Sequence, residues 1–164
     1  MPKHSHYILH KPYGYLSQLV NNQDKRRNKR LLGELYDFAE GTMAIGRLDE
    51  NSEGLLLLTT DGQVSEQIRS KKVEKEYYVQ LDGIISPNAL AELQVGVAIS
   101  IKGKAYTTLK CKSLLLTEAP DVSPPSPHIR AGRHRPTSWI AITITEGKYR
   151  QIRKMTAKVG YPTM

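Results

Sequence analysis

The sequence contains a single cysteine, Cys111, among its 164 residues. One thiol excludes an internal disulfide framework and any zinc site built from cysteines. It is typical of proteins from a reducing, cytosolic compartment. The five histidines form no HExxH pattern, and no glycine precedes Gly147 at the spacing of a phosphate-binding loop. The common sequence signatures of metal and nucleotide binding are therefore missing.

Long apolar runs are missing as well. The longest is Leu55 to Leu58, which is far too short to span a bilayer. The first residues, MPKHSHYILHKPYG, lack the apolar stretch of a secretory signal. We therefore expect a soluble, cytoplasmic protein without a membrane partner. Its length is usual for one domain, so residues 1–164 are expected to form a single domain.

Negative charge is in short supply. Lys and Arg number 24 against 16 Asp and Glu, giving a net charge of +8. This balance favours a polyanionic partner, nucleic acid before membrane, although a merely soluble basic protein is the alternative. The cations gather in residues 21–30, 128–135 and 148–158. Residues 21–30 are expected to form an exposed basic loop, and residues 118–137, which contain the second segment, a long basic loop. All three could form one RNA-facing surface, or each could be an ordinary solvated face.

The expected secondary structure mixes strands and helices. Strands are predicted at 7–9, 54–59, 73–82, in segments of 99–116, and at 139–145. Helices are predicted at 31–35, 63–70, from Ser86-Pro87 onward, and at 148–159. The run at 54–59 shows no alternation, which predicts a strand buried on both faces. This mixed order favours an α+β fold over a doubly wound one.

The run GRLDENSEG at 46–54 places Asp49 in a polar loop directly before the apolar strand. Catalytic residues are often placed in this way, on a loop anchored to a rigid core. Three other interpretations compete. Asp49 could tighten a turn, or begin a calcium loop, although the twelfth position is Thr60 instead of Glu. It could also pair with Glu50 or Glu53 as in glycosidases.

Two further motifs carry candidate functional residues. In the strand KEYYV at 75–79, Tyr77 and Tyr78 point to opposite faces. Either tyrosine could be a core residue, and either could stack on a base. In EGKYRQIRKM at 146–155, Gly147 allows a tight turn, and Gln151 and Arg153 follow on the helix. Arg153 could pair with a carboxylate or be an ordinary surface cation.

Together these stretches resemble the RsuA-like family of ribosomal RNA pseudouridine synthases. The family signature GRLDxxSEGLLLLTxDG matches residues 46–62, KxYxV matches 75–79, and EGxxxQxRxM matches 146–155. Within the family, the chain is most similar to members that act on the large ribosomal subunit. We expect no N-terminal S4-type RNA-binding domain, which several relatives have. Family members usually continue beyond Pro162-Thr163 with further strands, so the chain is expected to be truncated at its C-terminus.

The resemblance implies a mixed, largely antiparallel sheet with flanking helices and a cofactor-free, metal-free reaction. The partner would be structured ribosomal RNA, in which a target uridine is flipped out and isomerised to pseudouridine. Asp49 would be the catalytic carboxylate, Tyr77 would pack on the base, and Arg153 would pair with Asp49. Arg47 would fill the gap left by the base. The other implied substrate-binding residues are Gln151 and, on phosphates, Lys148, Arg150 and Lys154.

Two other classes of function remain open from the sequence. One is an inactive, truncated relative that binds RNA without isomerising it. The other is a basic structural protein associated with the ribosome, although this class gives no reason for an apolar strand next to GRLD. The protein is expected to be a monomer.

Overall fold

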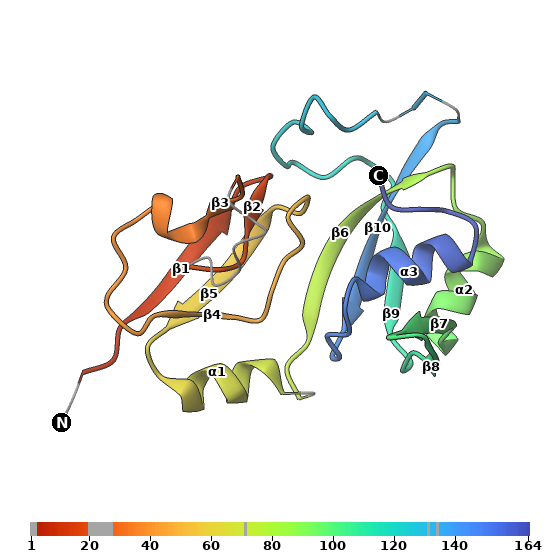
Figure 1. Cartoon of the computed structure of the whole chain (residues 1–164). Helices are drawn as coiled ribbons and strands as arrows, with labels where there is room; N and C mark the ends of the chain where they lie inside the picture. The colour runs from red at the N-terminus through yellow and green to blue at the C-terminus, as the bar shows by residue number, and fades with distance from the viewer. Residues whose placement is uncertain (1–2, 20–27, 71, 131, 134) are drawn as a thin grey trace. The chain divides into compact units, whose positions relative to one another are not determined.

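The computed structural model describes residues 3–19, 28–70, 72–130, 132–133 and 135–164. The chain divides into two compact units, Met1–Ser70 and Lys71–Met164. In Figure 1 the first unit is coloured from red to yellow and the second from yellow-green to blue.

The first unit is built on a three-stranded antiparallel sheet, β1 (His6–Lys11), β5 (Gly54–Thr59) and β4 (Met43–Ile45), in the order β1-β5-β4. Two short parallel strands, β2 (Tyr15–Leu16) and β3 (Arg30–Leu31), and a 3-10 turn, η2 (Leu32–Glu34), follow β1. Helix α1 (Gly62–Arg69) begins after Asp61, whose carboxylate accepts a hydrogen bond from the amide of Gln63. The helix packs against β4 and β5.

The prediction that the strand at 54–59 is buried on both faces is wrong. Leu56 and Leu58 are buried at 3% and 1% exposure, whereas Leu55 is 67% exposed. The buried face packs on a hydrophobic cluster with Leu32, and Ile8 lies on the opposite, open face at 80% exposure. An antiparallel sheet can leave one face uncovered, and a run of leucines does not reveal which face that is.

The second unit is built on another antiparallel sheet, β6 (Lys75–Asp82), β10 (Thr137–Ile144) and β9 (Lys112–Leu115), in the order β6-β10-β9. Strands β7 (Ala98–Ile101) and β8 (Lys104–Thr107) form a hairpin. Its turn has Lys102 and Gly103 at φ +50° and +77°, the conformation of a tight hairpin turn. The predicted break at Lys102-Gly103 is confirmed.

Helices α2 (Pro87–Val95) and α3 (Gln151–Lys158) pack on one face of this sheet (Figure 1). Leu93 from α2 and Met155 from α3 are fully buried against Val79 and Ile140 of the strands. The predicted start of α2 is confirmed, since the Ser86 hydroxyl accepts a hydrogen bond from the amide of Ala89 at 3.1 Å. The α+β fold class is likewise confirmed.

Helix α3 begins at Gln151, three residues later than the sequence predicts. Arg150 has a left-handed backbone, φ +51° and ψ +34°, so residues 148–150 form a turn before the helix. The predicted helix at 31–35 is shorter than expected, since only Leu32–Glu34 forms the turn η2. Most of the expected basic loop at 21–30 lies outside the described residues, but residues 28–30 are exposed as predicted.

Candidate active site

Asp49 lies half-buried in the loop between β4 and β5 of the first unit. The loop runs between Gly46 and Gly54, whose φ angles of +74° and +129° are rarely adopted by other residues. The carbonyl of Asp49 accepts a hydrogen bond from the amide of Ser52 at 2.9 Å, so Asp49 does begin a turn. The interpretation of Asp49 as a turn residue is therefore correct for its backbone. A chemical role for its side chain depends instead on how firmly the rest of the protein holds this loop.

A buried hydroxyl holds the residue directly before Asp49. Ser17 Oγ donates to the carbonyl of Leu48 at 2.9 Å and accepts from the amide of Leu48 at 3.0 Å. Ser17 is only 8% exposed, so water competes little for these bonds. One side chain therefore fixes both backbone groups of Leu48, and with them the point from which Asp49 projects.

A buried ammonium holds the residue directly after Asp49. Lys11 is fully buried, and its Nζ donates to the carbonyls of Pro12 at 2.8 Å, Tyr15 at 2.7 Å and Glu50 at 3.4 Å. The amide of Gly14 also donates to the carbonyl of Glu50, at 2.8 Å. The segment after β1 and the Asp49 loop are thus joined through backbone groups on both sides of Asp49.

The charge of Lys11 is part of this arrangement. Burial lowers the pKa of Lys11 from 10.5 to about 8, against the opposing effect of the negative charges on Glu53, Glu50 and Asp49. At pH 7 the side chain remains mostly protonated, so a fixed positive charge lies beside a loop rich in carboxylates. The carboxylate of Glu50 also binds Lys29, with both oxygens 3.0 Å from Nζ.

In the second unit, the two tyrosines of β6 lie on opposite faces as the alternation predicts. Tyr77 is half-buried and packs against the hydrophobic cluster beneath the helices. Tyr78 is 53% exposed on the other face. The contact between Tyr77 and a base stays a prediction.

A buried carboxylate organises the turn before α3. Glu146, at 4% exposure, accepts hydrogen bonds from the hydroxyl of Tyr106, the amide of Leu109 at 2.8 Å and Gln151 Nε2 at 2.8 Å. The other end of the Gln151 amide, Oε1, accepts from the amide of Lys148 at 3.1 Å. The hydrogen bond to Glu146, together with burial, raises the pKa of Tyr106. The ends of β8 and β10 and the start of α3 are thus tied to one carboxylate.

The cations around this turn are held near aromatic rings. Lys148 Nζ lies 5.0 Å from the centroid of the Tyr106 ring, and Lys154 Nζ lies 5.3 Å from that of Tyr149. Lys148 and Tyr149 are exposed, and Arg150 is half-buried. Positive charge is therefore concentrated at the N-terminal end of α3.

The candidate residues are divided between the units. Arg47, exposed, and Asp49 belong to the first unit. In the second unit, the start of α3 brings together Lys148, Arg150, Gln151, Arg153 and Lys154, while Tyr77 lies on β6. The pairing of Arg153 with Asp49 joins residues of different units and stays a prediction.

Sequence reasoning missed Lys11, Ser17 and Glu146 as parts of the site. One available signal was the alternation of HYILHK, which places Lys11 on the same strand face as Tyr7 and Leu9. A lysine on a buried face requires hydrogen-bond partners. The roles of Ser17 and Glu146 depend on residues more than 30 positions away, and no local pattern reports them.

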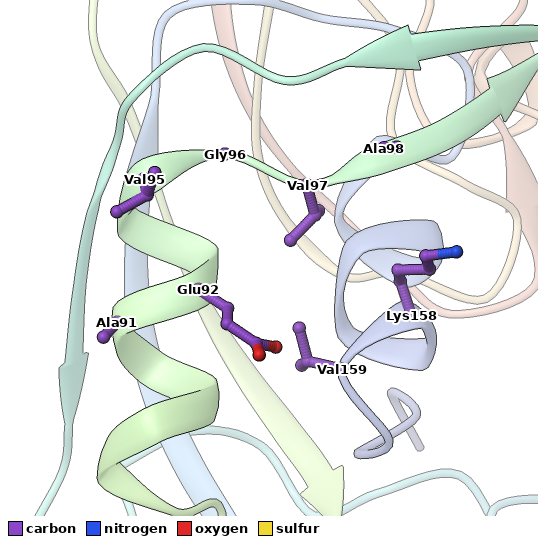
Figure 2. A pocket seen from close by; sticks show the side chains of 8 residues that line it. All are labelled: Ala91, Glu92, Val95, Gly96, Val97, Ala98, Lys158 and Val159. Carbon is purple, nitrogen blue, oxygen red and sulfur yellow. The ribbon is translucent and has the colours of Figure 1, made fainter.

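A hollow lies in the second unit between α2 and the end of α3 (Figure 2). Its volume is about 440 Å³. Its walls include Val95, Val97 and Val159, with Glu92 and Lys158 at opposite sides. No candidate residue lines it, so this hollow is separate from the residues discussed above.

The described part of the chain shows neither a cluster of metal-binding side chains nor a membrane-spanning helix. Among these residues, no three or more His, Cys, Asp or Glu side chains lie together as metal ligands would. No helix formed by the described residues is long and apolar enough to cross a membrane.

Comparison with known proteins places both units in one family. Residues 5–158 match the model of the RNA pseudouridylate synthase family. The chain is 38% identical over 159 residues to a ribosomal large subunit pseudouridine synthase E of Xanthomonas axonopodis pv. citri, covering 96% of this chain and 80% of that protein. It is 37% identical over 161 residues to a Vibrio parahaemolyticus protein of the same name, covering 96% of this chain but 63% of that protein.

A solved structure described as a pseudouridylate synthase has the same fold. It superposes with a TM-score of 0.75 at 26% identity, covering 100% of this chain and 61% of that chain. The chain thus spans less than two thirds of this structure and of the Vibrio relative. The resemblance inferred from three motifs is confirmed, and the chain belongs to the RNA pseudouridylate synthase family, a family of isomerases.

Proposed function

We propose that this protein isomerises a uridine of ribosomal RNA to pseudouridine and that Asp49 is its catalytic carboxylate. The observation that carries this proposal is the loop of Asp49, which buried Ser17 and Lys11 hold on both sides, in a chain of this family. The names of the relatives, which refer to the large ribosomal subunit, support a uridine of large-subunit RNA as the target.

The chemistry explains why a rigidly held carboxylate is needed. The bond between C1′ of the ribose and N1 of uracil breaks, the base turns, and a bond between C1′ and C5 forms. The proton on C5 is lost and N1 gains one, so the composition of the nucleotide is unchanged. A carboxylate could attack C1′, add to the ring or remove the C5 proton. Each of these roles requires its oxygen to be positioned within contact distance of the reacting atom.

The remaining candidate residues would hold the RNA. Extruding the target uridine costs a few kcal/mol of stacking, which contacts to the flipped base and to the gap must offset. In our proposal Tyr77 packs on the base and Arg47 occupies the gap. Arg153 pairs with Asp49 and balances its negative charge. The phosphate contacts, which position RNA without reading its sequence, come from Lys148, Arg150 and Lys154.

Gln151 contributes in a different way from these residues. Its side chain is 3% exposed, and both ends of its amide are hydrogen-bonded within the second unit. We propose that it acts on substrate binding through the turn that carries Lys148, instead of touching RNA itself.

Since the family model spans both units, we also propose that residues 1–164 work as one catalytic domain, as a cytoplasmic monomer.

The proposal is tested by mapping pseudouridine in ribosomal RNA from cells that lack this gene. We expect one large-subunit position to lose its pseudouridine, and expression of the wild-type chain to restore it. Expression of Asp49→Ala should leave the position unmodified. An unchanged pseudouridine map would overturn the proposal. RNA binding by the purified chain without any isomerisation would favour the inactive RNA-binding relative instead.

A further inference from the structure

Tyr149 is the most exposed aromatic side chain in the described part of the chain, at 73% exposure. It lies in the turn between β10 and α3, next to Lys148 and Arg150. Exposed tyrosines are common, but a large ring held within a cluster of cations is a specific arrangement. Such an arrangement suits a ligand that has both a flat π surface and negative charge.

One cation is held against this ring. Lys154 Nζ lies 5.3 Å from the ring centroid of Tyr149 and donates a hydrogen bond to the carbonyl of Ser100 at 2.9 Å. Because the ammonium is held in place by the carbonyl of Ser100, its cation–π contact restrains the ring of Tyr149. The large exposed area that remains is free for a further contact.

The turn that carries Tyr149 is itself held in place. Arg150, the next residue, has a left-handed backbone, and the amide of Lys148 is bonded to Gln151 Oε1. Gln151 is in turn fixed by the buried carboxylate of Glu146. A ring on such a support loses little conformational entropy when it binds a ligand.

We propose that Tyr149 is a stacking platform for an unpaired base of the RNA substrate, outside the target uridine. The base lies on the open face of the ring, and the neighbouring cations Lys148 and Arg150 bind the phosphates on either side. This inference rests on the proposed function, because it takes RNA as the ligand. Stacking on an aromatic ring tolerates any base, so Tyr149 contributes affinity and not sequence preference.

The test is equilibrium binding of two fluorescent probes by the whole chain, measured by fluorescence anisotropy. One probe is a ten-nucleotide oligouridylate, and the other is a ten-residue abasic ribose-phosphate strand of the same charge. Tyr149→Ala should weaken binding of the oligouridylate about 5- to 100-fold and leave the abasic strand unaffected. Tyr149→Phe, which keeps the ring, should bind both probes as the wild type does.

Salt dependence separates stacking from charge. In Tyr149→Ala the slope of log affinity against log salt should be unchanged, whereas Lys148→Gln should reduce it by about 0.7, the value for one phosphate contact on a single strand. Tyr36 gives a matched control. It is 59% exposed in the first unit, but its ring already packs edge-on against Phe38, so Tyr36→Ala should leave binding of both probes unchanged.

Unchanged binding of the oligouridylate by Tyr149→Ala would overturn the stacking platform, and so would an equal loss on both probes. The binding assay requires no turnover, so it also separates this proposal from the proposed function. Suppose that Asp49→Asn binds the oligouridylate and that adding Tyr149→Ala weakens this binding, while the wild type forms no pseudouridine. The stacking platform then stands and the enzymatic proposal fails. If pseudouridine forms and Tyr149→Ala binds normally, only the stacking platform fails.

Discussion

Lys11→Met removes the buried ammonium beside the Asp49 loop while keeping a side chain of similar length. In the folded state burial lowers the pKa of Lys11 from 10.5 to about 8, and in the unfolded state the ordinary value returns. Between these two pH values the unfolded state binds more protons than the folded state, so this group makes stability rise with pH. The cost of the buried charge is fully present below pH 8 and disappears above the unfolded pKa.

The magnitude follows from the two pKa values. At about 1.4 kcal/mol for each pKa unit, burial of the charged form costs roughly 3 kcal/mol at pH 7. About 2 kcal/mol of this cost should be relieved between pH 7 and pH 9.5. The free energy of unfolding of the wild type, minus that of Lys11→Met, should therefore rise by about 2 kcal/mol over this range. Because both proteins contain the same tyrosines and the same other lysines, the contribution of these groups to the pH dependence of stability cancels in the difference.

The assay is urea unfolding at pH 7 and pH 9.5, followed by circular dichroism. Fluorescence of Trp139, which lies on β10 of the second unit, shows whether both units unfold in one transition. A difference between wild type and Lys11→Met that stays constant with pH would refute the reasoning. It would mean that the ammonium of Lys11 is not held in a low-dielectric site.

Two further predictions concern the support of the active-site loop and the strand behind it. Ser17→Ala removes both hydrogen bonds to Leu48, so it should cost about 1–3 kcal/mol of stability. It should also lower kcat while changing KM little, and wild-type turnover would show that the hydroxyl does not position Asp49. Leu58→Ala should destabilise the protein by about 2–5 kcal/mol, whereas Leu55→Ala, on the exposed face of the same strand, should change stability by less than about 1 kcal/mol. Equal losses in urea unfolding would contradict the one-sided burial of β5.

Local signals explain which elements could be predicted from the sequence. The strands predicted at 73–82 and 139–145 correspond to β6 and β10, and Ser86 followed by Pro87 marks the start of α2 because the cap acts on amides three residues away. These features depend on near neighbours only. The family motifs add Asp49, whose short loop alone does not distinguish a turn residue from a catalytic one.

Features that depend on distant contacts could not be predicted in this way. The open face of β5 reflects how many layers cover the sheet, which the run of leucines does not encode. The late start of α3 reflects the left-handed Arg150 and the anchoring of Gln151 by Glu146. Glu146 is itself held by Tyr106 and Leu109, which lie 40 and 37 positions away. The hydrogen bonds that hold the Asp49 loop join Ser17 to Leu48 and Lys11 to Glu50, which lie 31 and 39 positions apart. They can therefore be recognised only in the folded chain.

The central claim, catalysis by Asp49, is tested most directly by tritium release from large-subunit ribosomal RNA that carries tritium on C5 of its uridines. Loss of the C5 hydrogen reports the isomerisation itself. The wild type should release tritium from one uridine for each RNA molecule, and Asp49→Asn should be slower by about 10²- to 10⁴-fold or more. Asp37→Asn, which changes an exposed aspartate of the same unit, should match the wild type. Wild-type release by Asp49→Asn would contradict the account.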